Sequence, residues 1–108
     1  MVSSWPFSLL QEGAIDVALL FTTDGVIAAE GFVLLEDDLG LQPAESMIPA
    51  IATSILTEYD GAIEAVLNAV SAELTTEGLT EMNRLVGYVG DDPVVVATTW
   101  LREAGLID

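Results

Sequence analysis

The stretch Ile15–Gly25, IDVALLFTTDG, decides how the rest of the chain is interpreted. Its first seven residues form an almost unbroken apolar run, which is typical of a strand buried on both faces of a parallel sheet. Two hydroxyls, a carboxylate and a glycine follow at once, and this composition indicates a polar turn. Because Thr23 and Asp24 are both favoured N-cap residues, the turn predicts one helical turn over residues 26–30.

Further apolar runs lie on both sides of this stretch. Phe32–Leu35 predicts a second strand, which ends in the acidic triplet 36–38. The loop LGLQPAES follows, and Met47–Ile55 predicts a third strand or an extended piece, with its proline favouring an edge. Upstream, Ser8–Glu12 predicts a short helix that ends at a glycine.

The second half of the chain has helical spacing. Apolar residues from Ala62 to Leu74 recur on one helical face, and a second helix follows Thr75 as its N-cap. Asp92 and Pro93 are a strong helix start, because Asp caps well and Pro suits the first helical position. The last helix is expected to run to Ala104.

This order predicts an α/β fold of few strands followed by three C-terminal helices. Three strands are too few for a self-contained doubly wound sheet. We therefore expect the sheet to be completed by association with another chain, because unpaired strand edges invite self-pairing.

Composition narrows the possible functions. The 108 residues suffice for one domain, and 18 acidic against 2 basic residues give a net charge of −16. Such a surface repels nucleic acid and anionic lipid, and it suits either solubility alone or a cationic ligand. No run approaches the length of a membrane span, and no secretory signal is recognised at the N-terminus, so the chain as given is expected to stay cytoplasmic.

The sequence gives little support for an enzyme or for a metal-binding protein. The chain has no histidine and no cysteine, which removes the commonest general base and the usual transition-metal ligands. No phosphate loop, dinucleotide fingerprint or nucleophile motif occurs. The triplet Glu36–Asp38 suits either a hinge with solvated charges or a Mg²⁺ or Ca²⁺ site, but calcium-loop spacing is absent. We expect no enzyme activity, no cofactor and no metal.

An ordered set of segments resembles one known family. Phe21–Asp24, Val33–Asp38 and Leu41–Glu45, followed by LTTEGLTEMNRLV, Asp92-Pro93 and WLREAGLI, are similar to the substrate-binding proteins of osmoprotectant ABC transporters. That class takes up glycine betaine, choline and carnitine. Each piece is weak by itself, whereas their order is specific, and the resemblance covers nearly the whole chain from about residue 9.

The resemblance implies two α/β lobes of the type II periplasmic binding-protein kind, with the ligand in the cleft between them. Residues 1–30 would then be a remnant of the second lobe. Residues 31–108 would hold a crossing strand and the C-terminal half of the first lobe. Family members are much longer, so the signal, the start of the first lobe and most of the second are expected to be absent here.

The resemblance also implies a set of ligand-binding residues: Phe21, Thr22, Thr23, Asp24 and Glu45. Phe21 offers a ring to a quaternary ammonium, whose recognition depends on aromatic faces. At Glu45 a carboxylate stands where the family has an aromatic wall, and it would attract a cation by Coulomb force. Local alternatives stay open for each: core packing for Phe21, turn backbone for the threonines, a helix cap for Asp24 and solvated charge for Glu45.

Two functions therefore remain. The first is a solute-binding component of an ABC-type uptake system for a small quaternary-amine or zwitterionic osmolyte, located outside the cytoplasm and working with a permease. The second is a truncated homologue that binds no solute and serves as an oligomerising module. In both cases a homodimer is expected and nucleic acid is not.

Overall fold

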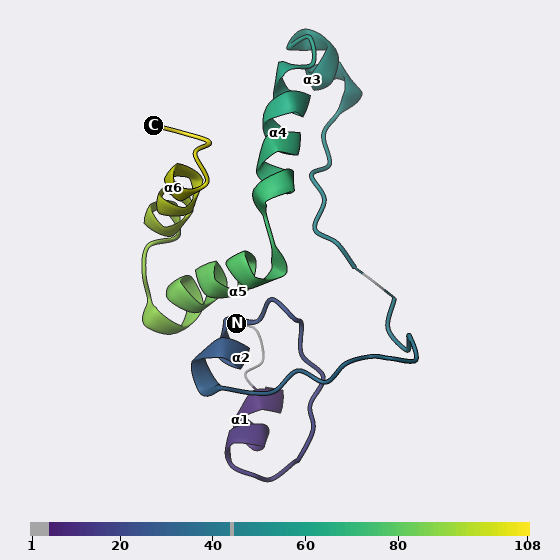
Figure 1. Ribbon diagram of the computed structural model, residues 1–108, viewed down its shortest axis with the longest axis vertical. Coiled ribbons are helices and arrows are strands. Elements are labelled where there is room, and N and C mark those ends of the chain that lie inside the picture. Colours follow the sequence, from purple (N-terminus) through teal and green to yellow (C-terminus); the bar gives the residue numbers. More distant parts are fainter. Residues whose placement is uncertain (1–4, 44) are drawn as a thin grey trace. The chain divides into compact units, whose positions relative to one another are not determined.

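The computed structural model describes residues 5–43 and 45–108, and in them all regular structure is helical (Figure 1). The helices are α1 (Trp5–Gln11), α2 (Gly25–Glu30), α3 (Thr53–Glu58), α4 (Ala62–Glu73), α5 (Thr76–Arg84), the π-helix η1 (Leu85–Val89) and α6 (Pro93–Glu103). None of these described helices is both long and apolar enough to cross a bilayer.

The predicted α/β fold is wrong for the described residues as far as strands are concerned. The segments 15–21 and 32–35 contain no strand, and the third predicted strand gives way to α3 from Thr53. A strand needs a neighbour for its backbone N–H and C=O groups, and the described chain supplies none to these segments. Several of their apolar side chains stay in solvent instead, with Leu19 79% and Val33 83% exposed.

The helix starts and stops predicted from sequence are confirmed in most cases. Thr75 caps α5, because its hydroxyl accepts the backbone N–H of Gly78 at 3.0 Å. Asp92 precedes Pro93 and its Oδ1 accepts the N–H groups of Val94 and Val95 at 2.8 and 3.2 Å. The short helix α3 and the π-helix η1 were not predicted.

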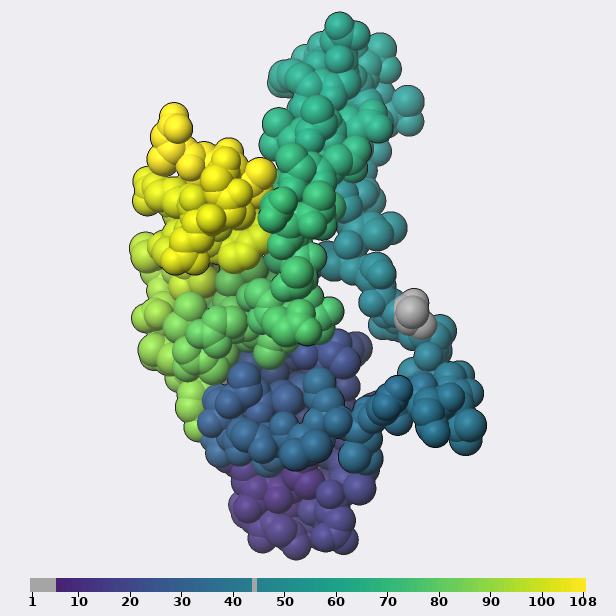
Figure 2. Space-filling view, viewed as in Figure 1, coloured from purple at the N-terminus to yellow at the C-terminus, as the bar shows by residue number. Residues whose placement is uncertain are grey.

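The chain divides into two units. The first contains the residues up to Leu34 together with Thr75–Ala97, and the second contains Leu35–Leu74 together with Thr98–Asp108. In the first unit, α2 packs against α5 and η1, and Figure 2 shows the blue atoms of α2 against the green atoms of α5. In the second unit, α3 packs against α4.

The apolar core of the described residues is small. Ile27 on α2 and Val96 on α6 are the buried hydrophobic residues, each 7% exposed, and both belong to the first unit. Most large apolar side chains of the extended segments are exposed, since these segments lack packing partners. Burial of apolar surface is the main stabilising term in folding, so the first unit is where tertiary stability concentrates.

Candidate functional site

The turn that follows the first apolar run is closed by its own hydrogen bonds. The backbone N–H of Phe21 donates to Oδ2 of Asp24 at 3.1 Å, and the N–H of Asp24 donates back to the carbonyl of Phe21 at 3.0 Å. The bond from the Asp24 N–H is the i→i+3 bond of a β-turn, and the Asp24 side chain adds a second bond across the same turn. Hydrogen bonds within Phe21–Asp24 therefore close this turn without any contact to a distant residue.

Asp24 occupies the N-cap position of α2 without capping the helix through its side chain. Its backbone is extended, with φ −66° and ψ 118°, and its carboxylate makes no cap hydrogen bond. The first helical bond runs from the N–H of Ile27 to the Asp24 carbonyl at 3.1 Å. The side-chain cap interpretation is wrong, because the carboxylate is turned back onto Phe21.

Phe21 is not a core residue. Its side chain is 72% exposed, so the packing alternative from the sequence is wrong. An accessible aromatic face is what a quaternary ammonium needs, because the attraction acts through the ring quadrupole at short range. A role for Phe21 as a cage wall stays a prediction.

The backbone of Thr22 and Thr23 is held from a distant helix. The hydroxyl of Thr80 donates to the carbonyl of Thr22 at 3.0 Å, and the side-chain amide of Asn83 donates to the carbonyl of Thr23 at 2.8 Å. Both donors belong to α5. The turn backbone is thus satisfied by other groups, and the hydroxyls of Thr22 and Thr23 make no hydrogen bond within the described residues.

Gly25 allows this contact between the turn and α5. A Cβ atom added there would lie 2.4 Å from the backbone nitrogen of Arg84 and 2.8 Å from the carbonyl carbon of Asn83. Backbone atoms cannot yield as a flexible side chain does, so no residue larger than glycine fits. The glycine that closes the FTTDG stretch is required by tertiary packing.

Glu45 and the acidic triplet belong to the second unit, whereas Phe21–Asp24 belong to the first. Glu45 is exposed and lies in irregular structure, and its ligand role stays a prediction. Asp37 of the triplet accepts the N–H groups of Gln42 at 2.8 Å and Leu41 at 2.9 Å, which lower the pKa of its carboxyl. The triplet therefore organises its loop, and the described residues contain no carboxylate group of three suited to a metal ion.

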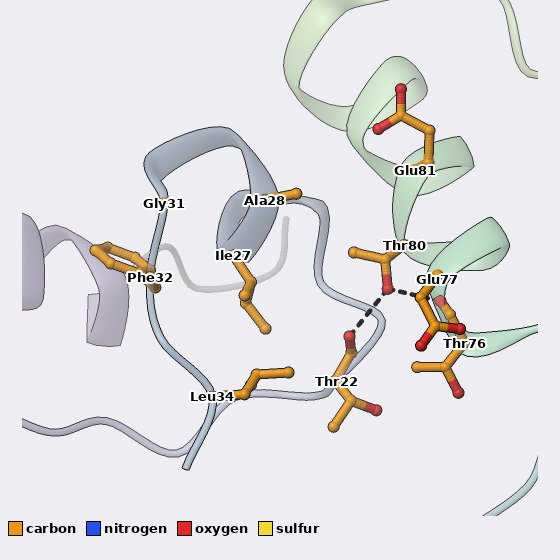
Figure 3. Close-up of a pocket in the computed structure, with 10 residues that line it drawn as sticks. All are labelled: Thr22, Ile27, Ala28, Gly31, Phe32, Leu34, Thr76, Glu77, Thr80 and Glu81. Carbon is orange, nitrogen blue, oxygen red and sulfur yellow. Dashed lines mark hydrogen bonds between the residues drawn. The ribbon is translucent and has the colours of Figure 1, made fainter.

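A pocket of about 380 Å³ opens beside the turn within the first unit. Figure 3 shows apolar side chains of Ile27, Phe32 and Leu34 on one side, and the polar residues of α5 facing them across the pocket. Glu77 and Glu81 give the polar side a negative charge, although Glu81 is paired with Arg84 at 2.7 Å. Of the five predicted ligand-binding residues, Thr22 is the one that lines this pocket.

A further contact joins α2 to the π-helix. The hydroxyl of Tyr88 donates to the carboxylate of Glu30, and this bond, with a smaller contribution from Gln11, lowers the pKa of Glu30. The same hydrogen bond, followed by the charge of Glu30, raises the pKa of Tyr88. The hydrogen bond from Tyr88 thus links the C-terminal end of α2 to η1.

Thr80, Asn83 and Gly25 are the site residues that sequence reasoning did not find. The bonds from Thr80 and Asn83 span 58 and 60 residues along the chain, a separation at which local patterns carry no information. One signal was available: Thr80 and Asn83 are polar and three apart, so they share a helix face.

The family comparison and the comparison with curated proteins both find similarity to glycine betaine-binding proteins. Residues 8–103 match OpuAC, the family described as the substrate binding domain of the ABC-type glycine betaine transport system. The glycine betaine-binding protein YehZ of Escherichia coli (strain K12) is 32% identical over 95 residues, which are 88% of this chain and 31% of YehZ. This chain therefore spans about a third of the length of that relative. No solved structure matches.

Proposed function

Because the chain belongs to the family of substrate-binding domains of ABC-type glycine betaine transport systems, we propose that it forms part of a binding cleft for a small quaternary-amine or zwitterionic solute. The family resemblance read from the sequence is confirmed. Members of this family bind a transported substrate and are not enzymes. The specific solute and the contacting residues are our proposal.

The exposed ring of Phe21 is the observation that carries this assignment. It is 72% exposed and belongs to a turn closed at Asp24 and anchored to α5, so the ring is offered to solvent from a fixed backbone. A trimethylammonium group cannot donate an N–H bond and is held by such faces. The hydroxyls of Thr22 and Thr23 suit the carboxylate of a zwitterion such as glycine betaine.

In the complete receptor, the turn would stand on one wall of the cleft and Glu45 on the facing wall. Residues 1–30 would belong to the second lobe and residues 31–108 to the crossing strand and first lobe. Asp24 would orient the turn and the bound solute through its carboxylate. Location outside the cytoplasm and delivery to an ABC permease are part of the same proposal, and they rest on the family.

Titration calorimetry tests the proposal on this chain. One cation–π contact contributes about 0.5–2 kcal/mol and Phe21 is the one ring of the proposed set, so we expect weak binding, with a Kd on the order of 1 mM or weaker. We expect heat with glycine betaine, choline, carnitine or proline betaine, and its loss in Phe21→Ala. Phe21→Tyr keeps the ring and is expected to keep binding. Absence of heat with all four solutes contradicts the proposal.

A second candidate function is an oligomerising module that binds no solute. The exposed apolar side chains of the extended segments favour it, because contiguous apolar surface of this kind marks interfaces. Val33 and Leu35 are 83% and 77% exposed on either side of Leu34. A second copy of the chain would cover such surface, and we propose a homodimer in either case.

A further inference from the structure

Helix α5 reaches the candidate turn at three successive points. The Thr80 hydroxyl and the Asn83 amide bond the carbonyls of Thr22 and Thr23, at 3.0 and 2.8 Å. The next contact is steric, where Gly25 lies directly against the backbone at Arg84. Two donors three residues apart on one helix face thus hold two consecutive peptide groups.

The two donors are not equivalent. The Thr80 hydroxyl also lies 2.8 Å from the carbonyl of Thr76 in its own helix, so its single proton is shared between two acceptors. The Asn83 amide has no other bonded acceptor within the described residues, and its contact is the shorter of the two turn contacts. Asn83 is therefore the main anchor, and Thr80 supports it.

These contacts fix which side of the turn a solute can reach. The carbonyls of Thr22 and Thr23 are directed at α5, and Oδ2 of the Asp24 carboxylate accepts the Phe21 N–H. Figure 3 shows the side chain of Thr22 directed away from Thr80 while its carbonyl points toward it. The Phe21 ring, the threonine hydroxyls and Oδ1 of Asp24 remain for a ligand.

We propose that Asn83 and Thr80 are positioning residues of the solute site, which hold the turn in its binding geometry without touching the solute. The solute in this proposal comes from the proposed function, whereas the hydrogen bonds from Asn83 and Thr80 to the turn belong to the structure itself. A turn held in advance loses less conformational freedom when the solute binds, so affinity depends on the anchors.

Hydrogen exchange on the free chain tests the anchoring. The N–H groups of Phe21 and Asp24 are bonded within the turn, and that of Ile27 is bonded to the Asp24 carbonyl, so the exchange of all three reports opening at the turn. In Asn83→Ala we expect these three amides to exchange about three- to tenfold faster, the factor for one lost hydrogen bond. Asn68→Ala, an exposed asparagine of α4 without a bonded partner in the described residues, is the matched control and should leave them unchanged. Unchanged exchange in Asn83→Ala overturns the proposal.

Glycine betaine calorimetry then tests positioning on the same variants. Asn83→Ala is expected to weaken binding by about three- to tenfold and Thr80→Val by less, whereas Thr80→Ser, which keeps the hydroxyl, should bind as the unaltered chain does. Faster exchange with unchanged affinity overturns the positioning role. If the unaltered chain gives no heat while Asn83→Ala still speeds exchange, the anchoring is supported and it is the proposed function that fails.

Discussion

At Gly25, α2 lies directly against the backbone of α5. A Cβ there would meet the Arg84 nitrogen at 2.4 Å and the Arg84 Cα at 2.5 Å. Because both atoms are backbone, the two helices must separate to admit a side chain. The same separation would break the bonds from Asn83 and Thr80 to the turn.

We therefore predict that Gly25→Ala lowers the free energy of unfolding by roughly 1–3 kcal/mol, the range for overpacking. Urea denaturation followed by circular dichroism measures it. Gly87→Ala is the control, since nothing outside its own helical turn lies within 4 Å of its added Cβ, and at this helical position it should leave stability unchanged or raise it by up to about 1 kcal/mol. Equal effects of the two substitutions would contradict the close approach.

Tyr88 and Glu30 form a hydrogen-bonded pair of titratable groups in the first unit. The pKa of Tyr88 is raised because its proton is held by Glu30 and because a phenolate there would face a carboxylate. A raised pKa in the folded state means that the bond stabilises the fold below about pH 10 and is lost as the pH rises through the raised value.

Absorbance of the phenolate checks this in a Tyr59→Phe background, where Tyr88 is the remaining tyrosine. We expect its titration midpoint to fall toward about 10 in Glu30→Gln, because the neutral amide removes the charge. Circular dichroism across the same range shows that the fold persists. Identical midpoints in the two proteins would contradict the Tyr88–Glu30 bond.

At the scale of elements, α6 begins at a preorganised cap. The carboxylate of Asp92 accepts two N–H groups of the first turn, and Pro93 has no N–H to lose at the first position. We predict that Asp92→Ala lowers the free energy of unfolding by about 1 kcal/mol, whereas Asp92→Asn, which keeps an acceptor, costs a few tenths. Thermal unfolding measures both. A loss in Asp92→Asn as large as in Asp92→Ala would count against the cap.

Helices were predictable from sequence where a local signal exists. Thr75, Asp92 and Pro93 act within their own helix, so their spacing alone indicates where α5 and α6 begin. The strands at 15–21 and 32–35 were predicted from apolar runs, yet a strand forms only where a neighbour pairs with it. The helix α3 was missed because the apolar residues around it were assigned to a strand.

The candidate site was likewise predictable only where its residues are neighbours in the sequence. The polar cluster at Phe21–Asp24 was found because hydroxyls and a carboxylate directly follow an apolar run. Its anchors on α5 were missed, since the bonds from Thr80 and Asn83 cross 58 and 60 residues. The alternative of Asp24 as a side-chain helix cap was wrong because an N-cap residue can also fold its side chain back onto the preceding turn, whereas its ligand role stays a prediction.

At the scale of the whole molecule, the extended segments expose apolar side chains that a second copy of the chain could cover, as we propose. Val33 is 83% exposed beside other apolar residues, and a net charge of −16 opposes nonspecific association. We predict a homodimer at micromolar concentration in sedimentation velocity, and a shift to monomer in Val33→Lys. Ala65→Lys on α4 adds the same charge elsewhere and should stay dimeric. A monomer at every concentration would contradict the dimer.

Nuclear magnetic resonance of the labelled chain during a glycine betaine titration tests the proposed solute site most directly. The site at Phe21–Asp24 predicts the largest shift changes at the amides of those four residues, accompanied by Glu45, at millimolar solute. The same titration of Phe21→Ala should leave these amides unmoved. Shift changes confined to other residues, or none at any solute concentration, would contradict a solute site at this turn.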